Sequence, residues 1–482
     1  MKVAESMKRA AAEVLIVGAG PVGLFLATEL LRRGRTVLLI ERRDGPSTHS
    51  KALALMPRTL EIFELAHVER PFVAALNRID SVRFFTPSGS AQVEFGSLPT
   101  SYRHVSMLPQ WKTEAILAAR VAELGGMIHY AHELRNFEQD AGGITATIET
   151  LGGTLTARAE YIVGCDGAWS RVRELAGIPF EGRSYPLGSM LADAQLDTAI
   201  PRNEAQVHFY SKGVVTIFPM DQQLRRIVAI EPESEIPPIA DRSWLQERLD
   251  RANAKARVDG VVWSSAFHVH RRIARRMRAG HVLLAGDAAH IHSPVGGQGM
   301  NLGLHDAWNL GWKLAFALAG DAPEILLDTY ERERLPAARD VVRRTDMLTH
   351  ALADPRPPMR AARRLLAPVA LRMRTMHALT ARRLAQLDMP YAPRIPDIRL
   401  SDGSRLYARF ETGYGVVVEG GSPPLHAKWL TAYLAPPHEA HGELILVRPD
   451  GYIAYKTRND DAFKAIARAL SYLRKRGLTI AT

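Results

Sequence analysis

The first residues whose types and spacing indicate chemistry form a G-x-G-x-x-G pattern from Gly18 to Gly23. In such a pattern the first glycine allows a tight turn, Gly20 lets backbone amides approach a pyrophosphate, and the last glycine lets a helix pack closely on a sheet. Pro21 and Val22 occupy the helix start, where oriented N–H groups and a partial positive charge attract phosphates. The pattern therefore predicts a dinucleotide site.

The elements that must hold this turn lie on either side of it. Residues 13–17 are an apolar run typical of a buried strand, residues 24–33 have helical apolar spacing, and residues 36–40 predict a second strand. Glu41 ends the second strand about 20 residues after the glycines, where a carboxylate accepts a hydrogen bond from a ribose 2′-hydroxyl. The two strands, the turn, the helix and the acidic residue occur together in the expected order. A glycine-rich turn that arose by chance does not explain this combination.

Two further acidic residues follow apolar strands. Asp166 and Gly167 come after the strand expected at residues 161–164, and Asp287 comes after the one expected at residues 281–285. Ligands of parallel sheets collect at the carboxyl ends of the strands, so we expect both aspartates to face the same ligand.

A glycine-rich turn after Asp287 opens a helix at Gly299, Met300 and Asn301, and Pro294 precedes that turn. The start of this helix can present backbone N–H groups to an anionic ring oxygen.

These three motifs, in this order and at these separations, resemble those of the group A flavoprotein monooxygenases, the FAD-dependent aromatic hydroxylases. The resemblance covers nearly the whole chain and points to the branch that hydroxylates phenols, polyketides and rifampicin. It implies an α/β fold like that of p-hydroxybenzoate hydroxylase, in which a Rossmann-type FAD-binding domain is interleaved with an antiparallel substrate-binding sheet.

The resemblance also implies roles for individual residues. The glycine turn and Glu41 would hold the ADP half of FAD, Asp166 with Gly167 would lie near the pyrophosphate, and Asp287 would contact the ribityl chain. The flavin ring and its linker would be contacted by residues from three other segments: Gln110, Pro294, Gly299, Met300 and Asn301. Only the Pro294 backbone is assigned a catalytic position, on the flavin face, and no general base is assigned.

Lys51 departs from the family pattern, which often has arginine in the matching segment. A lysine retains the positive charge but lacks the bidentate fork of a guanidinium. We expect Lys51 to act on the flavin pyrophosphate or on ring motion with this reduced geometry.

The implied reaction uses NADPH or NADH to reduce FAD and O₂ to form a C4a-hydroperoxyflavin, which hydroxylates an aromatic substrate. FAD supplies the difficult chemistry, and the protein positions it and excludes water. The sequence has no second G-x-G-x-x-G unit between a strand and a helix, so we expect NAD(P)H to bind transiently at the surface. Arg42 and Arg43 are predicted phosphate contacts for it, with solvated charges at a strand end as the alternative.

Between the second and third motifs the pattern changes to alternating strands, at residues 206–210, 214–219 and 226–230. Residues 81–85 and 91–95 resemble a hairpin that joins the same sheet. In the resembled family such a sheet covers the flavin and lines the substrate pocket. The pocket candidates are Phe209, Phe218, Pro219 and Met220. Ordinary core packing is the alternative for each of them.

We expect four units along the chain. The FAD-binding domain takes residues 1–77, 104–180 and 275–345, and the substrate sheet takes residues 78–103 and 181–274. An arginine-rich helical segment with a linker follows at 346–395. The arginines of that segment lie at residues 360–383. In residues 396–482 we expect strands at 414–418 and 443–447, the R-P-D-G-Y turn at 448–452 with a further strand up to 455, and a helix at 461–475. This arrangement resembles a thioredoxin-like domain, which here contains no cysteine and so has no disulfide chemistry.

Composition limits the alternatives. The chain has 482 residues, one cysteine, Cys165, and a net charge of +11. No apolar run approaches the ~18 residues of a membrane span, and a cytoplasmic location is expected. His290 and His292 lack a third metal ligand at a diagnostic spacing, so no metal is expected. The basic clusters lack interleaved aromatic residues, so we interpret the charge as attraction for anionic nucleotides rather than nucleic acid.

Two other functions stay open at this point. One is a membrane-surface flavin oxidoreductase acting on a quinone or isoprenoid, because basic helices bind anionic lipid. The other is a non-catalytic flavin-containing binder of an aromatic drug. A homodimer is also left open by the resemblance.

Overall fold

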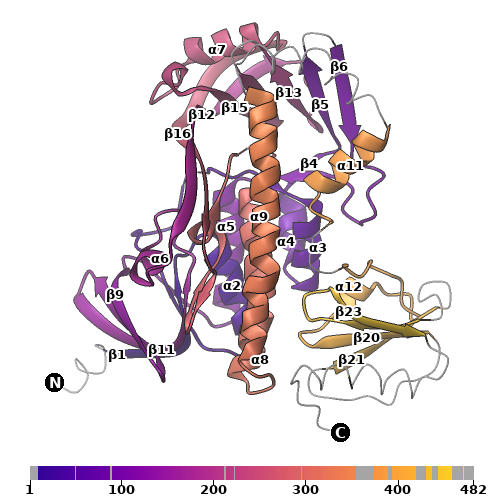
Figure 1. Ribbon diagram of the computed structural model, residues 1–482. Coiled ribbons are helices and arrows are strands. Elements are labelled where there is room, and N and C mark those ends of the chain that lie inside the picture. Colours follow the sequence, from indigo (N-terminus) through magenta and orange to yellow (C-terminus); the bar gives the residue numbers. More distant parts are fainter. Residues whose placement is uncertain are drawn as a thin grey trace.

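The computed structural model describes residues 9–48, 50–86, 89–210, 213–221, 223–294, 296–353, 374–388, 393–419, 430–436, 443–458 and 471. A sheet whose central strands are parallel and whose outer strands include antiparallel ones, called the parallel sheet below, forms with its helices the lower left of the view in Figure 1, and a second large sheet lies above it. The long helix α9 runs between the two, and the tail lies to the lower right. No helix of the described residues has the length and apolarity needed to cross a membrane.

The predicted strand–turn–helix–strand unit forms the centre of the parallel sheet. β1 (Arg9–Val17) pairs in parallel with β2 (Val37–Ile40) on one side and with β11 (Gly153–Gly164) on the other. The crossover helix α2 (Pro21–Leu31) begins at the proline rather than at residue 24. β18 (Val282–Leu284) lies parallel to β11, shorter at both ends than expected. The carboxyl ends of β1, β2, β11 and β18 therefore lie along one edge of the sheet. The motif residues Gly18, Glu41, Asp166 and Asp287 follow these four ends.

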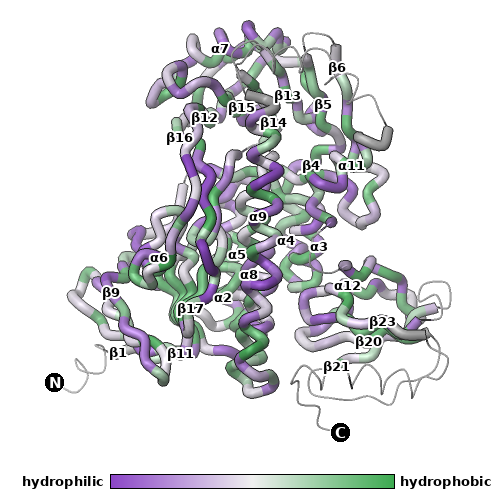
Figure 2. The backbone as a smooth tube through the Cα atoms, viewed as in Figure 1, coloured by the Kyte–Doolittle hydropathy of each residue, from purple (hydrophilic) through white to green (hydrophobic). Residues whose placement is uncertain are grey.

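The remaining strands extend this sheet and cover its core. Its path runs β17-β18-β11-β1-β2-β8, with β10 and β9 added through β11. These additional strands are β8 (Ile128–His129), β9 (Glu133–Asp140), β10 (Gly143–Thr150) and β17 (Arg278–Ala279). Figure 2 shows apolar chain concentrated where the central strands meet α2, in agreement with the largest buried cluster of the structure.

The second sheet has the order β19-β16-β12-β15-β14-β13-β5-β6. Its strands are β5 (Ser81–Thr86), β6 (Gly89–Glu94), β12 (Phe180–Thr198), β13 (Glu204–Phe209), β14 (Val214–Pro219), β15 (Leu224–Pro232), β16 (Ala256–Ala274) and β19 (His290–Ile291). The expected hairpin and the three expected strands are present. The sheet is antiparallel as expected except at one place, where β5 pairs with β13 in parallel.

Helices pack on both sheets. α2 packs against α5 and α8 beside the parallel sheet, and α7 covers the outer face of the second sheet (Figure 1). The helices of these layers are α3 (Pro57–Leu65), α4 (Glu69–Ala75), α5 (Gln110–Glu123), α6 (Arg171–Leu175), α7 (Arg242–Arg251), α8 (Gly299–Leu318), α9 (Ile325–Ala353) and α11 (Arg374–Leu384). Two single turns are η1 (Glu233–Glu235) and η2 (Gly286–Ala288), and a small sheet joins β3 (Ala54–Leu55), β7 (Val105–Met107) and β4 (Asn77–Ile79).

The tail forms a four-stranded sheet in the order β21-β20-β22-β23. Its elements are α12 (Leu406–Arg409), β20 (Tyr414–Glu419), β21 (Leu430–Ala435), β22 (Glu443–Val447) and β23 (Ile453–Arg458). Three of these strands were expected, and β21 was not. The helix expected at residues 461–475 and most of the arginine-rich stretch at residues 360–383 lie outside the described residues. The thioredoxin-like assignment stays a prediction.

The R-P-D-G-Y turn, residues 448–452, fastens the tail to the FAD-binding half. Arg448 donates two hydrogen bonds of 2.8 Å to Glu333 on α9, and the same carboxylate accepts from Lys313 of α8 at 2.9 Å. Asp450 pairs with Arg448, and its backbone carbonyl accepts from Trp308 Nε1 at 3.0 Å. Burial lowers the pKa of Lys313 to about 8, against the opposing effect of Glu333.

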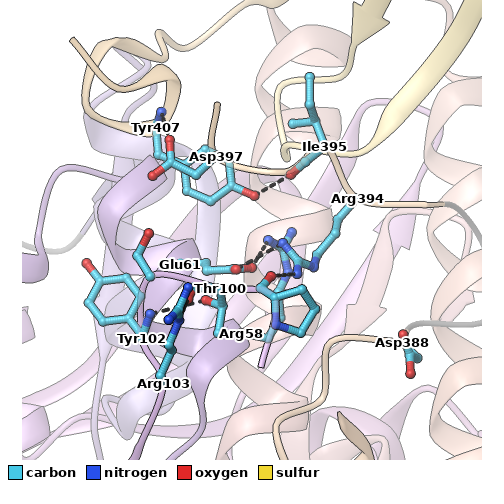
Figure 3. A network of polar contacts seen from close by, with 12 residues as sticks. Arg58, Glu61, Thr100, Tyr102, Arg103, Asp388, Arg394, Ile395, Asp397 and Tyr407 are labelled. Atoms are coloured by element: carbon cyan, nitrogen blue, oxygen red, sulfur yellow. Dashed lines mark hydrogen bonds and ion pairs between the residues drawn. The ribbon is translucent and has the colours of Figure 1, made fainter. Parts of the chain in front are cut away.

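A second contact joins the tail to α3. Arg58 is fully buried, pairs with Glu61 at 2.8 Å and lies over the ring of Tyr452. Arg394 approaches from the tail side and donates to Glu61 at 3.0 Å, as Figure 3 shows. Its other terminal nitrogen donates to the Pro99 carbonyl, so one arginine joins α3 to the loop that follows β6.

We predict that Glu333→Gln lowers the free energy of unfolding by about 3 kcal/mol or more at pH 7, because it leaves buried cations without their carboxylate. Burial would raise the pKa of Glu333, but Arg448 and Lys313 outweigh it and hold the pKa well below the ordinary 4.5. The stabilisation is therefore present above pH 4.5 and is lost as the pH falls further. Urea unfolding from pH 7 to pH 3 should show the two proteins converging at the acid end.

Glu443→Gln is the matched control, because Glu443 forms an exposed pair with Lys456 in the same tail. It should change stability by no more than about 1 kcal/mol. Equal losses in the two variants would contradict a special role for the buried pair.

Candidate active site

The three glycines of the first motif have different surroundings. Gly18 has φ +103°, and a β-carbon on it would lie 2.5 Å from the carbonyl oxygen of Cys165. A β-carbon on Gly23 would lie 1.9 Å from the carbonyl oxygen of Gly18, whereas one on Gly20 would meet no atom within 4 Å. Gly18 and Gly23 are thus required by backbone packing, and Gly20 faces open space at the start of α2, whose first turn has no side-chain cap.

Cys165 fills the space behind this turn. Burial raises the pKa of its thiol well above the ordinary value, so the thiolate is not available for chemistry.

Glu41 fastens the glycine turn from the end of β2. Its carboxylate accepts a hydrogen bond from the Ala19 amide at 2.9 Å and from the Arg43 amide at 3.0 Å. Burial would raise the pKa of Glu41, but the bonds from Arg43 and Ala19 outweigh it, so the pKa is lowered and Glu41 is ionised. Of the two predicted arginines, Arg43 turns inward toward Glu41 and Glu114, and Arg42 is exposed.

Gln110 holds the loop that carries Lys51. Its side-chain oxygen accepts from the Ala52 amide at 3.1 Å, and its nitrogen donates to Glu114 at 2.9 Å. Both ends of the amide are therefore used within the protein, and its predicted contact with the flavin linker stays a prediction.

The Asp166 carboxylate is hydrogen-bonded within the protein at the start of α6. It accepts from Ser170 Oγ at 2.5 Å and from the Val172 amide at 3.1 Å, although burial still raises its pKa above the ordinary value. Gly167 has φ +80° and no atom within 4 Å of a β-carbon position, so its backbone faces open space as that of Gly20 does.

Asp287 lies in the turn η2, just after the carboxyl end of β18. Its side chain is exposed, yet the surrounding protein raises its pKa above the ordinary value, against the positive charges of His290 and Lys51. Lys51 is exposed too, and its charge acts on the same carboxylate.

The start of α8 is fixed by Asn301. Its oxygen accepts from the Met56 amide at 2.9 Å and from Thr59 Oγ1 at 2.7 Å, and its nitrogen donates to the Ala54 and Gly297 carbonyls. The side chain predicted to contact the flavin is thus buried and joins α8 to α3. Met300 and Pro294 are half-buried, and Met300 packs against the main core.

A buried ionic network under Asp287 was not predicted. Asp306 of α8 accepts from His290 Nε2 at 2.6 Å, from Arg334 Nε at 2.7 Å and from the Gly286 amide at 3.1 Å. Burial would raise the pKa of Asp306, but the two cationic partners outweigh it and lower it. His290 is therefore a support for the turn that carries Asp287. Among the described residues no group of three or more suitable side chains forms a metal site.

The four pocket candidates do not form one group. Phe218 and Met220 pack in a cluster with Leu53 and Met56, beside the loop that follows Lys51. Pro219 is buried, and Phe209 packs in a separate cluster near Tyr185. Phe209 and Phe218 keep intermediate exposure although they lie on the sheet face opposite α7, which makes them the two candidates able to meet a ligand.

Arg226 lies between these clusters and was not predicted. It is 1 % exposed, donates two bonds of 2.6 and 2.7 Å to Asp193, and donates a third to the Lys51 carbonyl at 3.2 Å. The sheet is thereby tied to the Lys51 loop. The sequence feature that could have identified Arg226 is a charged residue inside an otherwise apolar strand.

The residues present fit a flavin dinucleotide. Two open glycine backbones, an uncapped helix start, an accessible aspartate and a lysine line the carboxyl edge of the parallel sheet. Amides and a cation suit a pyrophosphate, and a carboxylate suits the hydroxyls of a sugar chain.

Comparison with known proteins agrees with this. A family model described as an FAD binding domain matches residues 11–345. The chain is 35% identical to 12-dehydrotetracycline 5-monooxygenase/anhydrotetracycline 6-monooxygenase of Streptomyces rimosus, over 95% of this chain and 98% of that one. It is 32% identical to the rifampicin monooxygenase of Streptomyces venezuelae, over 92% and 95%. The solved anhydrotetracycline hydroxylase OxyS of Streptomyces rimosus superposes with a TM-score of 0.84 at 31% identity, covering 98% and 100%.

These findings confirm the expected fold class, cofactor FAD and aromatic monooxygenase chemistry. The division into four units, the cofactor contacts of individual residues, the homodimer and the cytoplasmic location stay predictions.

We predict opposite outcomes for two alanine substitutions in the glycine turn. Gly18→Ala should lower the free energy of unfolding of the FAD-free protein by at least about 1 kcal/mol, because of its positive φ and its contact with Cys165. Gly20→Ala should leave that stability within about 0.5 kcal/mol and raise the Kd for FAD about tenfold or more. Thermal unfolding of the apoprotein and fluorescence titration with FAD measure the two effects.

Gly45→Ala controls for alanine at an open glycine, because a β-carbon there also meets no atom within 4 Å. It should change neither quantity. Unchanged FAD affinity in Gly20→Ala would contradict the assigned pyrophosphate position.

Proposed function

The chain belongs to the family of FAD-binding aromatic and polyketide monooxygenases, and from this premise we propose that it hydroxylates a fused-ring phenolic compound with NAD(P)H and O₂. The relatives whose names give anhydrotetracycline and rifampicin suggest the size and polarity of the substrate. The observation that carries the proposal is the carboxyl edge of the parallel sheet, where the Gly20 backbone faces open space and the side chains of Lys51 and Asp287 are exposed.

We assign the cofactor positions as follows. The amides at the start of α2 hold the pyrophosphate beside Gly20, and Asp287 accepts hydrogen bonds from the ribityl hydroxyls. Lys51 supplies a positive charge near the same chain. The Pro294 backbone and the start of α8 border the ring. Glu41 and Gln110 position the cofactor indirectly. Each holds by a hydrogen bond a loop that reaches the cofactor, Glu41 the glycine turn and Gln110 the Lys51 loop.

Bound FAD would accept a hydride from NAD(P)H and activate O₂ for transfer of one oxygen atom to the substrate. The chain's own contribution is electrostatic and steric. Amides at the start of α8 favour negative charge on the adjacent ring edge, and the sheet above excludes water from the reacting atoms. Phe209 and Phe218 offer apolar surface to the substrate from that sheet.

The part of the chain that the structure describes has no second dinucleotide-binding unit, so NAD(P)H is proposed to bind at the surface and to leave after each hydride transfer. Arg43 is held by Glu41 and Glu114. The exposed Arg42 is therefore the better candidate for a phosphate contact there.

The proposal is tested with purified holoenzyme, NADPH or NADH, and either anhydrotetracycline or rifampicin under ¹⁸O₂. We expect substrate-stimulated oxidation of the nicotinamide and a product carrying one ¹⁸O atom. A protein that retains FAD and binds these compounds without product would be a flavin-containing binder. Activity restricted to a quinone or isoprenoid in anionic vesicles would indicate the membrane-surface alternative.

We predict that Asp287→Ala raises the Kd for FAD about tenfold or more and loses flavin on dialysis, because the ribityl hydroxyls lose their acceptor. Asp259→Ala, on an exposed part of β16, is the control and should retain flavin as the unsubstituted protein does. Full flavin occupancy of Asp287→Ala after extensive dialysis would exclude the assigned role.

A further inference from the structure

A cavity of about 350 Å³ lies where the tail meets β4 and the loop between β6 and β7. Arg78 of β4, Arg103 of that loop and Arg405, just before α12 of the tail, all line it, and we call it the arginine pocket. None of the residues assigned to the flavin lines it. It is therefore a cavity separate from the cofactor site described above.

Two of these arginines carry charges that the protein does not pair. Arg78 is exposed and has no ion pair or side-chain hydrogen bond with any residue that the structure describes. Arg103 is exposed too, and its Nε donates to the Thr100 carbonyl at 3.3 Å, which leaves both terminal nitrogens without a partner in that part of the chain. A cavity lined by charge of one sign raises the local concentration of ions of the opposite sign.

The charge of Arg78 acts inside the pocket. Burial lowers the pKa of His104, which also lines the pocket, and Arg78 lowers it further, against the weaker effect of Asp80. Asp80 is the acidic residue of the lining, and it accepts a hydrogen bond from Asn203 Nδ2 at 2.8 Å. The lining thus has more positive than negative charge.

Arg405 is held in place from the tail side. It donates to the Asp397 carboxylate and to Ser101 Oγ, so its charge is paired and it joins the tail to the loop. A hydroxyl has one donor and two acceptor positions. Ser101 therefore accepts from Arg405 and keeps its own proton for a ligand.

Tyr102 supplies a flat apolar wall beside these polar groups. Its hydroxyl is hydrogen-bonded to Glu64, and its ring lies edge-on to the ring of His104, with 6.4 Å between the centroids. Figure 3 shows Tyr102 and Arg103 side by side on the loop. The pocket thus combines ring surface with guanidinium groups.

We propose that the arginine pocket binds a phosphate monoester. A guanidinium donates two parallel hydrogen bonds to a phosphate, and the monoester's terminal oxygens can accept from both unpaired arginines and from Ser101. Its charge of about −2 at pH 7 matches the two unpaired cations. The volume lies within the ~300–1,000 Å³ of small-molecule sites and leaves room for the group that carries the phosphate, against Tyr102.

The same chemistry has two sources, free phosphate and the 2′-phosphate of NADPH. Leu55 of β3 and Arg78 of β4 lie opposite the same residue of β7, Ser106, on its two sides. Two strand spacings, about 10 Å, therefore separate their backbones. Because Asn301 at the start of α8 donates to the carbonyl of Ala54 in β3, the pocket is within reach of a dinucleotide that approaches the flavin ring.

The test titrates the holoenzyme, in which FAD fills the glycine turn, with inorganic phosphate at constant ionic strength, by calorimetry. We compare it with the double variant Arg78→Gln with Arg103→Gln. We expect the double variant to raise the Kd for phosphate about tenfold or more. Its Tm without phosphate should be unchanged, because these arginines have no ion pair to lose among the described residues.

Arg70→Gln is the matched control. It removes an exposed arginine from α4, the helix that also borders the pocket, but Arg70 does not line the cavity. It should leave the Kd for phosphate within about twofold. Equal losses in this variant and in the double variant would mean that phosphate responds only to overall surface charge, and would overturn the proposal.

NADP⁺ and NAD⁺ distinguish the two sources, because they differ only in the 2′-phosphate. Binding of NADP⁺ about tenfold tighter than NAD⁺, lost in the double variant, assigns the pocket to NADPH. Equal Kd values for the two nucleotides, with phosphate binding that depends on the two arginines, assign it to free phosphate or another monoester. The proposal is overturned if neither phosphate nor NADP⁺ binds in a way that depends on these arginines.

The proposal goes beyond the hydroxylation and does not depend on it, since phosphate binding is measured without an aromatic substrate. A holoenzyme that binds phosphate at these arginines but hydroxylates neither anhydrotetracycline nor rifampicin contradicts the proposed function alone. A holoenzyme that hydroxylates one of them, and whose binding of phosphate and of NADP⁺ is unchanged in the double variant, contradicts the phosphate site alone.

Discussion

Close approach of backbones at one edge of the parallel sheet is the constraint on which the rest of the molecule depends. Gly23 touches Gly18, Gly18 touches Cys165, and Val22 packs where Gly286 and Gly303 leave no room for a β-carbon. Segments separated by more than a hundred residues thereby meet within van der Waals distance. Any side chain at these glycines would separate the segments, and the open space beside Gly20 and Gly167 would lose its shape.

Much of this was predictable because the determinants are local. The glycine spacing, the apolar runs before Glu41, Asp166 and Asp287, and the change to alternating strands after residue 181 each depend on a few neighbouring residues. Side-chain partners were less predictable, since they depend on contacts across the fold. The sequence did not indicate that Asn301 bonds to the Met56 amide or that Gln110 bonds to the Ala52 amide, and their flavin contacts stay predictions. Arg42 and Arg43 differ only in which one turns inward.

Charged residues inside apolar segments are visible in the sequence, but the apolar pattern alone does not indicate what they contact. Asp306, Arg334, Arg226 and Lys313 are all nearly inaccessible, and each joins elements that belong to different parts of the chain. An amphipathic pattern treats such residues as irregularities. In the structure they decide how the sheet, the helices and the tail are oriented relative to one another.

The length of α8 connects three of these attachments. Asn301 holds its first turn, Asp306 its second, and Trp308 and Lys313 hold the part that meets the tail, where Trp312 also packs on the tail sheet. A chain cut before residue 393 would expose the Trp312 face and leave Lys313 and Glu333 without Arg448. The tail is therefore not a detachable module. An exchange of tails between related enzymes has to carry the matching faces of α8 and α9 with it.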